Sequence, residues 1–300
     1  MIAILMAFTV FVWDNDMGKV IYDGYLHKFV GFEYSVSWAL KTNDCKVDIG
    51  TKLPDISILK GYDALFIVNG TRKQDLMDQK EIDIIKEFLK IGGKSIYIEG
   101  NNVVEFFGSK FPEMLTLLGV KLSEPTMDGL ITEVIGAEKS FLEGEKYSYS
   151  SEDYLSNDVD VVVPGAENAS ACLFTGTNQK AYWAAAVGYG FGAFKASPYR
   201  TLTSSVVFGG IYSFNLTDSE KERAHLMKKY IDFLTHMDNK GYEDSNSENT
   251  EEYGTLFVTG IRQIPMGVLY SLDGKICKNP TSGIYFLKNG KRILKVVFIR

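Results

Sequence analysis

The hydrophobic and polar positions predict a strand–helix–strand unit near the middle of the first half of the chain. Residues 62–70 form a short apolar run that ends in Asn69-Gly70, and residues 94–101 form a second such run. Short apolar runs bounded by turn residues are typical of buried strands. Between them, apolar residues recur at three- and four-residue steps and stop before Gly92-Gly93, which indicates an amphipathic helix. A connection of this length makes the two strands parallel, and a parallel sheet needs cover on both faces.

The same reasoning extends the pattern in both directions. Residues 8–13 predict a first strand, residues 25–40 a helix interrupted near Gly31, residues 45–49 a short strand, and residues 103–118 a helix broken near Pro112 and ended by Gly119. From residue 120 to residue 199 the pattern changes to short β-like runs, at 131–135, 159–163, 171–174 and 181–187. Residues 200–210 predict a strand that returns to the sheet, and a last helix begins at Asp218.

Two boundaries divide the chain. Residues 238–253 hold six acidic residues against one lysine and little to bury, which predicts a solvated acidic linker before residues 254–300. Those last residues predict short strands joined by turns such as Asn289-Gly290, a small β-hairpin appendage. At the other end, residues 1–7 are apolar but precede a stretch that is already long enough for the first strand. They are either part of a long strand or the remnant of a signal peptide.

Composition excludes some classes of function. The formal net charge is -6 with no cluster of basic residues, which argues against a nucleic-acid partner. The apolar start is too short to span a bilayer, so an integral membrane protein is not expected. The three cysteines are widely spaced and suggest neither a disulfide framework nor a metal site.

Two family resemblances follow from particular stretches. Six stretches of the chain resemble the class I glutamine amidotransferase-like fold, in its non-catalytic extracellular form. They are the strand end at residues 12–18, Gly61-Tyr62-Asp63 before the next strand, residues 88–94, Ile98-Glu99-Gly100, and the closing strand and helix at residues 199–201 and 226–234. That resemblance covers residues 8–237 and implies a flavodoxin-like, doubly wound, mostly parallel α/β sheet. Residues 268–275, 282–288 and 295–300 resemble the C-terminal sorting domain of type IX secretion. That second resemblance implies export to the cell surface or beyond, with the secretion machinery as a partner.

The residues do not support acyl-transfer chemistry. A hydrolase of this fold needs a nucleophile on the turn after the strand at 94–99, but that turn is Gly100-Asn101 and holds neither Cys nor Ser. No histidine follows the last predicted strand, and His27, His225 and His236 fall on predicted helices. The sequence therefore predicts a non-catalytic binding or structural protein, although the enzyme question stays open.

Acidic and amide side chains at the strand ends are the best candidates for a site. Asp14, Asp16, Asn69, Glu99 and Asn101, with Asn102 beside them, follow three predicted parallel strands. The carboxyl ends of such strands converge where ligands bind. Oxygen ligands of this kind suit Ca²⁺ or Mg²⁺, and no other cofactor is expected.

Each of these residues also has a structural interpretation. Asp14 and Asp16 could cap the first helix, and Asn69 and Asn101 could shape turns. A carbohydrate or other cell-surface partner is a further expectation, from the aromatic, glycine-rich stretch that contains Tyr182 and Trp183, although core packing also explains that stretch. The alternative function is a hydrolase that acts on a glycan or amide through Asp14, Asp16 and Glu99.

Overall fold

The computed structural model describes most of the chain. It covers residues 7–23, 26–124, 127, 129–150, 152–156, 158–178, 182–194, 197–212 and 219–235, and four strands within 255–299. The contacts between residues divide the chain into two compact units, residues 1–241 and 242–300. The expected acidic linker at 238–253 and the expected signal remnant, apart from Ala7, lie outside the described residues.

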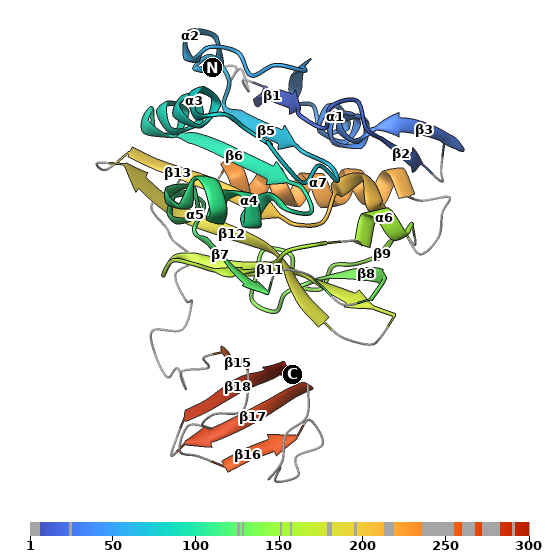
Figure 1. Ribbon diagram of the computed structural model, residues 1–300, viewed down its shortest axis with the longest axis vertical. Helices are drawn as coiled ribbons and strands as arrows, with labels where there is room; N and C mark the ends of the chain where they lie inside the picture. Colours follow the sequence, from blue (N-terminus) through green and yellow to red (C-terminus); the bar gives the residue numbers. More distant parts are fainter. Residues whose placement is uncertain are drawn as a thin grey trace, which may run out of the picture. The chain divides into compact units, whose positions relative to one another are not determined.

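The first unit is built on a ten-stranded sheet, half of which is parallel (Figure 1). The parallel half follows the order β4-β1-β5-β6-β13. Its strands are β1 (Thr9–Asp14), β4 (Lys46–Gly50), β5 (Ala64–Val68), β6 (Lys94–Glu99) and β13 (Ser197–Ser204). The predicted strand–helix–strand unit is confirmed, because β5 and β6 pair in parallel on either side of helix α3 (Gln79–Lys90).

The other half of the sheet is antiparallel, which corrects the expectation of a mostly parallel sheet. Its order outward from β13 is β12-β11-β8-β9-β14, and every one of these pairings is antiparallel. The strands are β8 (Ile131–Gly136), β9 (Lys146–Tyr149), β11 (Ala169–Thr177), β12 (Tyr182–Phe194) and β14 (Ile211–Tyr212). Strands joined by short connections pair most readily in the antiparallel sense, because no helix intervenes to carry the chain back.

Helices cover both faces of the parallel half. Helix α1 (Phe32–Thr42) and helix α7 (Ser219–Thr235) contribute to one buried apolar cluster, and α3, α4 (Val103–Lys110) and α5 (Pro112–Leu118) contribute to the other. Strand β1 shows why both faces carry an apolar core. Its residues Val10 and Val12 belong to the first cluster, whereas Phe11 and Trp13 belong to the second. Side chains alternate between the faces of a strand, so a continuous apolar run fills both cores.

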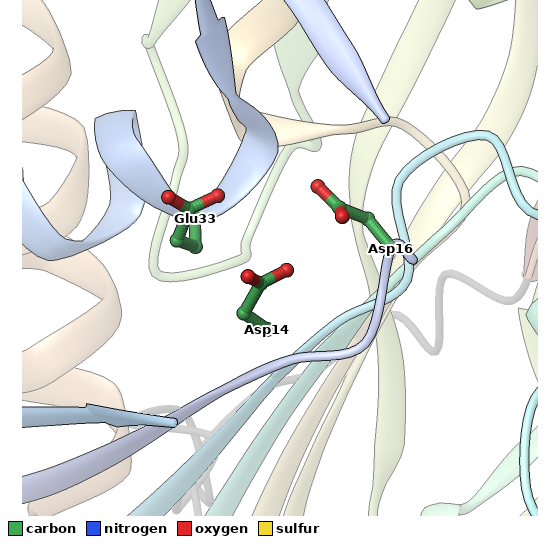
Figure 2. A group of neighbouring side chains, drawn as sticks. All are labelled: Asp14, Asp16 and Glu33. Carbon is green, nitrogen blue, oxygen red and sulfur yellow. The ribbon is translucent and has the colours of Figure 1, made fainter. Parts of the chain in front are cut away.

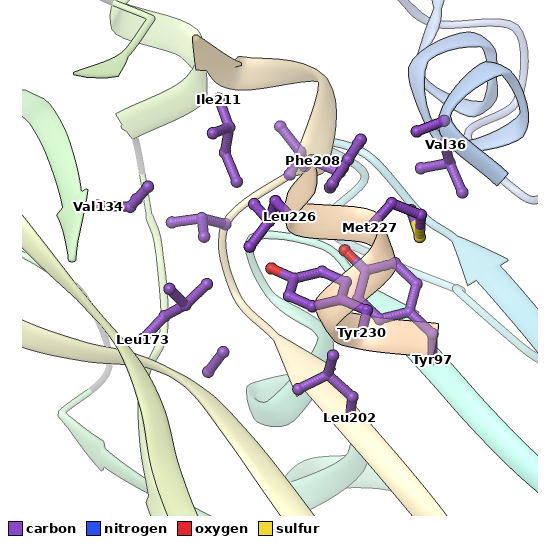
Figure 3. Packing of buried hydrophobic residues seen from close by; sticks show 14 of the residues in the cluster. Val36, Tyr97, Val134, Leu173, Leu202, Phe208, Ile211, Leu226, Met227 and Tyr230 are labelled. Carbon is purple, nitrogen blue, oxygen red and sulfur yellow. The ribbon is translucent and has the colours of Figure 1, made fainter. Parts of the chain in front are cut away.

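The core on the α7 side joins the two halves of the sheet (Figure 3). Leu226 and Tyr230 of α7 pack in the same cluster as Tyr97 of β6 and Leu173 of β11. The rings of Tyr97 and Tyr230 lie 5.6 Å apart between centroids. One contiguous core therefore spans the parallel and antiparallel strands, although their pairing rules differ.

The ends of the helices follow from local chemistry. Asp78 caps α3 by accepting from the Glu81 amide, and the Glu81 carboxylate accepts from the Asp78 amide, a reciprocal capping box. Pro112 begins α5 and Gly119 ends it with φ of 66°, so the predicted break and cap are both confirmed. The other short elements are α2 (Ile56–Leu59), α6 (Asp153–Ser156), the 3₁₀ turn η1 (Phe208–Gly210) and a two-stranded ribbon of β7 (Val120–Glu124) with β10 (Val161–Pro164).

The predicted helix over residues 25–40 is wrong in its first part. Here β2 (Val20–Asp23) and β3 (Lys28–Gly31) pair as antiparallel strands, and the helix begins only at Phe32. His27, expected on a helix, lies in the hairpin turn with φ of 51°. The apolar spacing of this stretch fits either period, and Gly31 marks the boundary because it takes the extended conformation that precedes a helix.

The second unit contains a four-stranded sheet in the order β15-β18-β17-β16. Its strands are β15 (Thr255–Thr259), β16 (Val268–Ser271), β17 (Gly283–Asn289) and β18 (Arg292–Ile299). The last three pair as antiparallel neighbours, and β15 joins β18 in parallel. These strands lie close to the positions that the hydrophobic pattern predicts for them. In the described part of the chain, no helix has the length and hydropathy needed to cross a bilayer.

Candidate functional site

Three carboxylates meet at the carboxyl end of β1, beside the start of α1 (Figure 2). Asp14 is the last residue of β1, Asp16 follows it, and Glu33 lies in the first turn of α1. One oxygen from each of the three lies within 4.8 Å of the others. The sequence placed Asp14 and Asp16 at this end of the sheet, and the structure adds Glu33.

Asp16 is buried and holds two backbone amides. One of its oxygens accepts from the Gly18 amide at 2.7 Å, and the other accepts from the Phe32 amide at 3.2 Å. Phe32 is the first residue of α1, so Asp16 satisfies an amide that the helix itself leaves without a partner. The carboxylate also complements the positive end of the helix dipole. Asp16 therefore caps the start of α1, which is the structural role that the sequence suggested for it.

Asp14 differs from Asp16 in its surroundings. Burial, together with the nearby charges of Asp16 and Glu33, raises the pKa of Asp14 to about 7. Its Oδ1 atom is buried, and no hydrogen-bond donor among the described residues reaches it. The pKa of Glu33 is raised as well, first by burial and then by the charge of Asp16. Three acids therefore share a small volume that disfavours their simultaneous ionisation.

The three carboxylates lack a cationic partner among the described residues. Within the part of the chain that the structure describes, none of the three carboxylates forms an ion pair with Lys, Arg or His. Close carboxylates without a basic partner either share a proton or bind a metal ion. Because all the available ligand atoms are carboxylate oxygens, the donor set fits Ca²⁺ or Mg²⁺.

The amide candidates lie nearby but serve a different purpose. Asn69 accepts from the Asn15 side chain at 2.8 Å and donates to the Glu99 carbonyl at 3.0 Å. Asn101 donates to the Leu155 carbonyl, and Asn102 donates to the Asp158 carbonyl. These bonds connect the loops that follow β5 and β6 to each other and to the segment before β10. The amides therefore shape the strand ends, and the carboxylate cluster does not include them.

Glu99 is fully buried beneath the site. Its Oε2 atom accepts from the Tyr97 hydroxyl at 2.5 Å and from the Phe208 amide at 2.8 Å, whereas Oε1 has no partner among the described residues. Burial raises the pKa of Glu99 to about 7. Its carboxyl group holds the η1 turn in place, which is a structural task, and it is not one of the three clustered acids.

Asp160 is a second buried acid, and no pattern in the sequence singles it out. It accepts from the amides of Val104 and Glu105 in the first turn of α4, and burial raises its pKa to about 7. An acid that caps a helix from a distant loop has no local sequence signal, since the capped residues lie more than fifty positions away.

The turn after β6, Ser204, Ser205 and Cys172 offer no activated Ser or Cys nucleophile. The turn after β6 is Gly100-Asn101, where Gly100 has φ of 153°. Ser204 and Ser205 donate to the carbonyls of Val206 and Ala185. Cys172 is fully buried, and that burial raises the pKa of its thiol. The geometry thus contains no activated nucleophile at the strand ends.

Comparison with known proteins gives only distant similarities. No protein-family model matches the chain, and no curated protein matches it. A solved ThuA-like protein from Bacteroides uniformis shares 10% identity at a TM-score of 0.46, over 78% of this chain and 94% of that one. A protein described as a GMP synthase subunit, from Thermoplasma acidophilum, shares 12% identity at a TM-score of 0.44, over 76% and 97%.

A third similarity is to the carbohydrate deacetylase Agd3. It extends over 91% of this chain but only 37% of that protein, with 8% identity and a TM-score of 0.43. With TM-scores below 0.5, these similarities assign neither a family nor an activity to this chain, so its function has to be argued from its own residues.

Proposed function

We propose that this protein is an exported, non-catalytic binding protein whose α/β domain binds a divalent cation at Asp14, Asp16 and Glu33. The observation that carries the proposal is the convergence of three carboxylates, from the end of a parallel strand and the start of a helix, within 4.8 Å. Burial raises the pKa of Asp14 and of Glu33 most, and the charge of Asp16 adds to both shifts; a divalent cation would offset that repulsion between the carboxylates.

The three acids would contribute unequally to such a site. Asp16 is held by two backbone amides and needs no rearrangement, so it is the fixed ligand. The buried Oδ1 atom of Asp14 gains a partner in the cation. Glu33 closes the site from α1, and Ca²⁺ or Mg²⁺ would complete its coordination with water.

The absence of acyl-transfer chemistry is supported by the turn after β6. Gly100-Asn101 offers no nucleophile, and the described Ser and Cys residues near the strand ends are bonded to carbonyls or buried. A binding role needs only the cation and the rim around it. Export is supported by the sorting-domain resemblance, and β16, β17 and β18 overlap the three stretches that carry it.

One observation favours a second candidate, a hydrolase that uses carboxylates. Asp16 accepts two amide bonds, whereas the pKa of Asp14 is raised to about 7. Two neighbouring acids in environments of this kind can divide general-acid and general-base tasks. Such an enzyme would act on a glycan or an amide without a covalent intermediate.

Calorimetric titration of the purified chain with CaCl₂ and with MgCl₂ tests the proposal. We expect one binding event per chain that Asp14→Asn and Glu33→Gln each abolish or weaken at least tenfold. Glu87→Gln is the control, because Glu87 is exposed on α3. Unchanged binding in Asp14→Asn, or no binding by the wild type near neutral pH, would reject the cation site.

The catalytic and export alternatives have their own measurements. Turnover of a glycan or amide substrate that Asp14→Asn abolishes, in a variant that keeps its melting temperature, would favour the hydrolase. Fractionation of the native culture with intact-mass analysis tests export. Full-length protein confined to the cytoplasm would overturn the exported role and leave the cation site to be judged by calorimetry.

A further inference from the structure

The β2–β3 hairpin has an exposed apolar face next to the carboxylate cluster. Met17, Val20 and Phe29 expose 77%, 49% and 66% of their surface, and all three lie on the segment from the end of β1 to the end of β3. They are three of the seven exposed large hydrophobic residues among the described residues. Such a concentration on one small ribbon is characteristic of an interaction surface.

The strand register shows which side chains share this outer face. Val20 pairs with Gly31, and Tyr22 pairs with Phe29, so these four positions lie on one face of the ribbon. The rings of Tyr22 and Phe29 contact each other edge to face, at 5.3 Å between centroids. Ile21 and Val30 point to the opposite face and are buried. The ribbon is thus anchored from below, and its apolar side faces outward.

The Glu33 carboxylate also lies on the outer side, at the Gly31 position. A Cβ atom added to Gly31 would come within 2.0 Å of Glu33 Oε2. A Cβ atom on Gly31 would point to the outer face of β3, because Gly31 is paired with Val20, which faces outward. A negative charge is therefore placed two residues along the strand from the exposed Phe29 ring. A side chain at position 31 would meet the flexible end of the Glu33 side chain and shift this carboxylate.

One edge of the ribbon is open to another strand. Among the described residues, β3 pairs with β2 alone in a two-stranded sheet. The β2 strand faces the body of the domain, since the Tyr22 carbonyl accepts from the Tyr212 hydroxyl at 2.9 Å. Unpaired strand edges accept extended peptides through backbone hydrogen bonds. Figure 1 shows the ribbon beyond the carboxyl ends of the parallel strands.

We propose that the β3 edge binds an extended peptide segment that carries an apolar side chain and a Lys or Arg two residues apart. A strand added beside β3 would place alternate side chains on the outer face, at the repeat that separates Phe29 from Gly31. The apolar side chain would pack against Phe29 and Tyr22. The basic side chain would reach the Glu33 carboxylate, which has no cationic partner within the described chain.

Charge complementarity selects this partner over other extended segments. The clustered acids next to the ribbon and the net charge of -6 both favour a basic ligand. The inference goes beyond the proposed cation site and does not depend on it. If a divalent cation occupies the cluster, it engages Glu33 and competes with the basic side chain, so Ca²⁺ would weaken peptide binding.

Selection of phage-displayed random heptapeptides on the full chain, in a chelating buffer without divalent cations, tests the proposal. We expect enrichment of sequences with an apolar residue and a Lys or Arg at positions two apart. Synthetic peptides of that pattern should bind with affinities reduced at least tenfold by Phe29→Ser and by Glu33→Gln. Ile58→Ser is the matched control, because Ile58 is 60% exposed on α2, and it should leave binding unchanged.

Charge reversal gives a decisive second measurement. Selection on Glu33→Lys should replace the basic residue of the pattern by Asp or Glu while the apolar position persists. Peptides without the two-residue spacing, or equal binding to the wild type and Phe29→Ser, would overturn the proposal. Because Phe29 and Glu33 are not core residues, both variants are expected to keep the fold, and their melting temperatures verify it.

Discussion

Arg223 and Asp23 form a buried ion pair between elements that are 200 residues apart in the chain. Their charged atoms lie 2.7 Å apart, and both side chains are at least 97% buried. Arg223 of α7 also donates to the carbonyls of Ile211 and Gly209, and its guanidinium lies 4.7 Å from the centre of the Tyr212 ring. The pair therefore fastens the β2–β3 ribbon to the last helix of the domain.

Removal of Arg223 should be strongly destabilising. Arg223→Met leaves the Asp23 carboxylate buried without its cation, and we expect a loss of about 3–5 kcal/mol in the free energy of unfolding, measured in urea. The double variant Asp23→Leu with Arg223→Met should recover part of that loss, since no buried charge remains. Lys228→Ala, which breaks the exposed pair with Asp232, should change stability by less than about 0.5 kcal/mol. Equal losses in Arg223→Met and Lys228→Ala would contradict the argument.

Glu99 should make the protein less stable as the pH rises toward neutrality. The folded protein holds the Glu99 proton up to about pH 7, whereas the unfolded chain releases it near the ordinary glutamate pKa of 4.5. The folded state therefore binds more protons between these values, so its stability falls as the pH increases through that window and levels off above it. For a group buried this fully, the difference is on the order of 3 kcal/mol.

The variant Glu99→Gln separates this contribution from those of other acids. It removes the titrating group but keeps its size, so the decline in stability between about pH 5 and about pH 7 should become shallower than in the wild type. Urea unfolding at several pH values measures the slope. Asp14 and Asp160 also have pKa values raised to about 7, so some slope should remain. An unchanged slope in Glu99→Gln would reject the assignment.

The sequence predicted the fold best where the signal is local. The β5–α3–β6 unit, the break at Pro112 and the cap at Gly119 all follow from residues within a few positions of each element. The antiparallel half was not predictable in the same way. The pairing of β11 with β8 joins strands about forty residues apart, and its register shifts between Gly176 and Thr177, which the hydrophobic pattern does not indicate.

The candidate site could be predicted only in part, again where the sequence signal is local. Asp14 and Asp16 follow a clear strand, and strand ends converge on ligand sites. Glu33 was missed because the apolar spacing predicts helix on both sides of the interruption near Gly31, so the sequence does not indicate a helix that begins at Phe32 with Glu33 in its first turn. Nothing near Asp23 in the sequence indicates that its partner is Arg223.

A divalent cation should stabilise the protein more at higher pH. The proposed ligand Asp14 has a pKa of about 7 in the folded protein, so below that value a cation must displace its proton. We expect a larger rise in melting temperature on addition of CaCl₂ at about pH 8 than at about pH 5.5, with the rise lost in Asp14→Asn. A rise that is the same at both pH values, or that persists in Asp14→Asn, would place the cation elsewhere.

Gly70 should be required for the position of α1 and hence for the site. Gly70 follows β5 with φ of 56°, and a Cβ atom there would lie 2.7 Å from the ring of Phe32, a fully buried residue. Gly70→Ala therefore combines left-handed strain with a clash, and we expect a loss of about 3 kcal/mol in urea unfolding. Because Phe32 donates its amide to Asp16, its displacement should also weaken cation binding in calorimetry.

Gly18 provides the matched control for this prediction. Its φ of 73° is also left-handed, but an added Cβ atom would meet nothing within 4 Å. Gly18→Ala should therefore cost only the backbone strain, about 1 kcal/mol. Equal losses in the two variants would show that strain alone matters, and that contact with Phe32 does not position the first turn of α1. A greater loss in Gly70→Ala, together with weaker cation binding, would connect the turn after β5 to the carboxylates through a single aromatic ring.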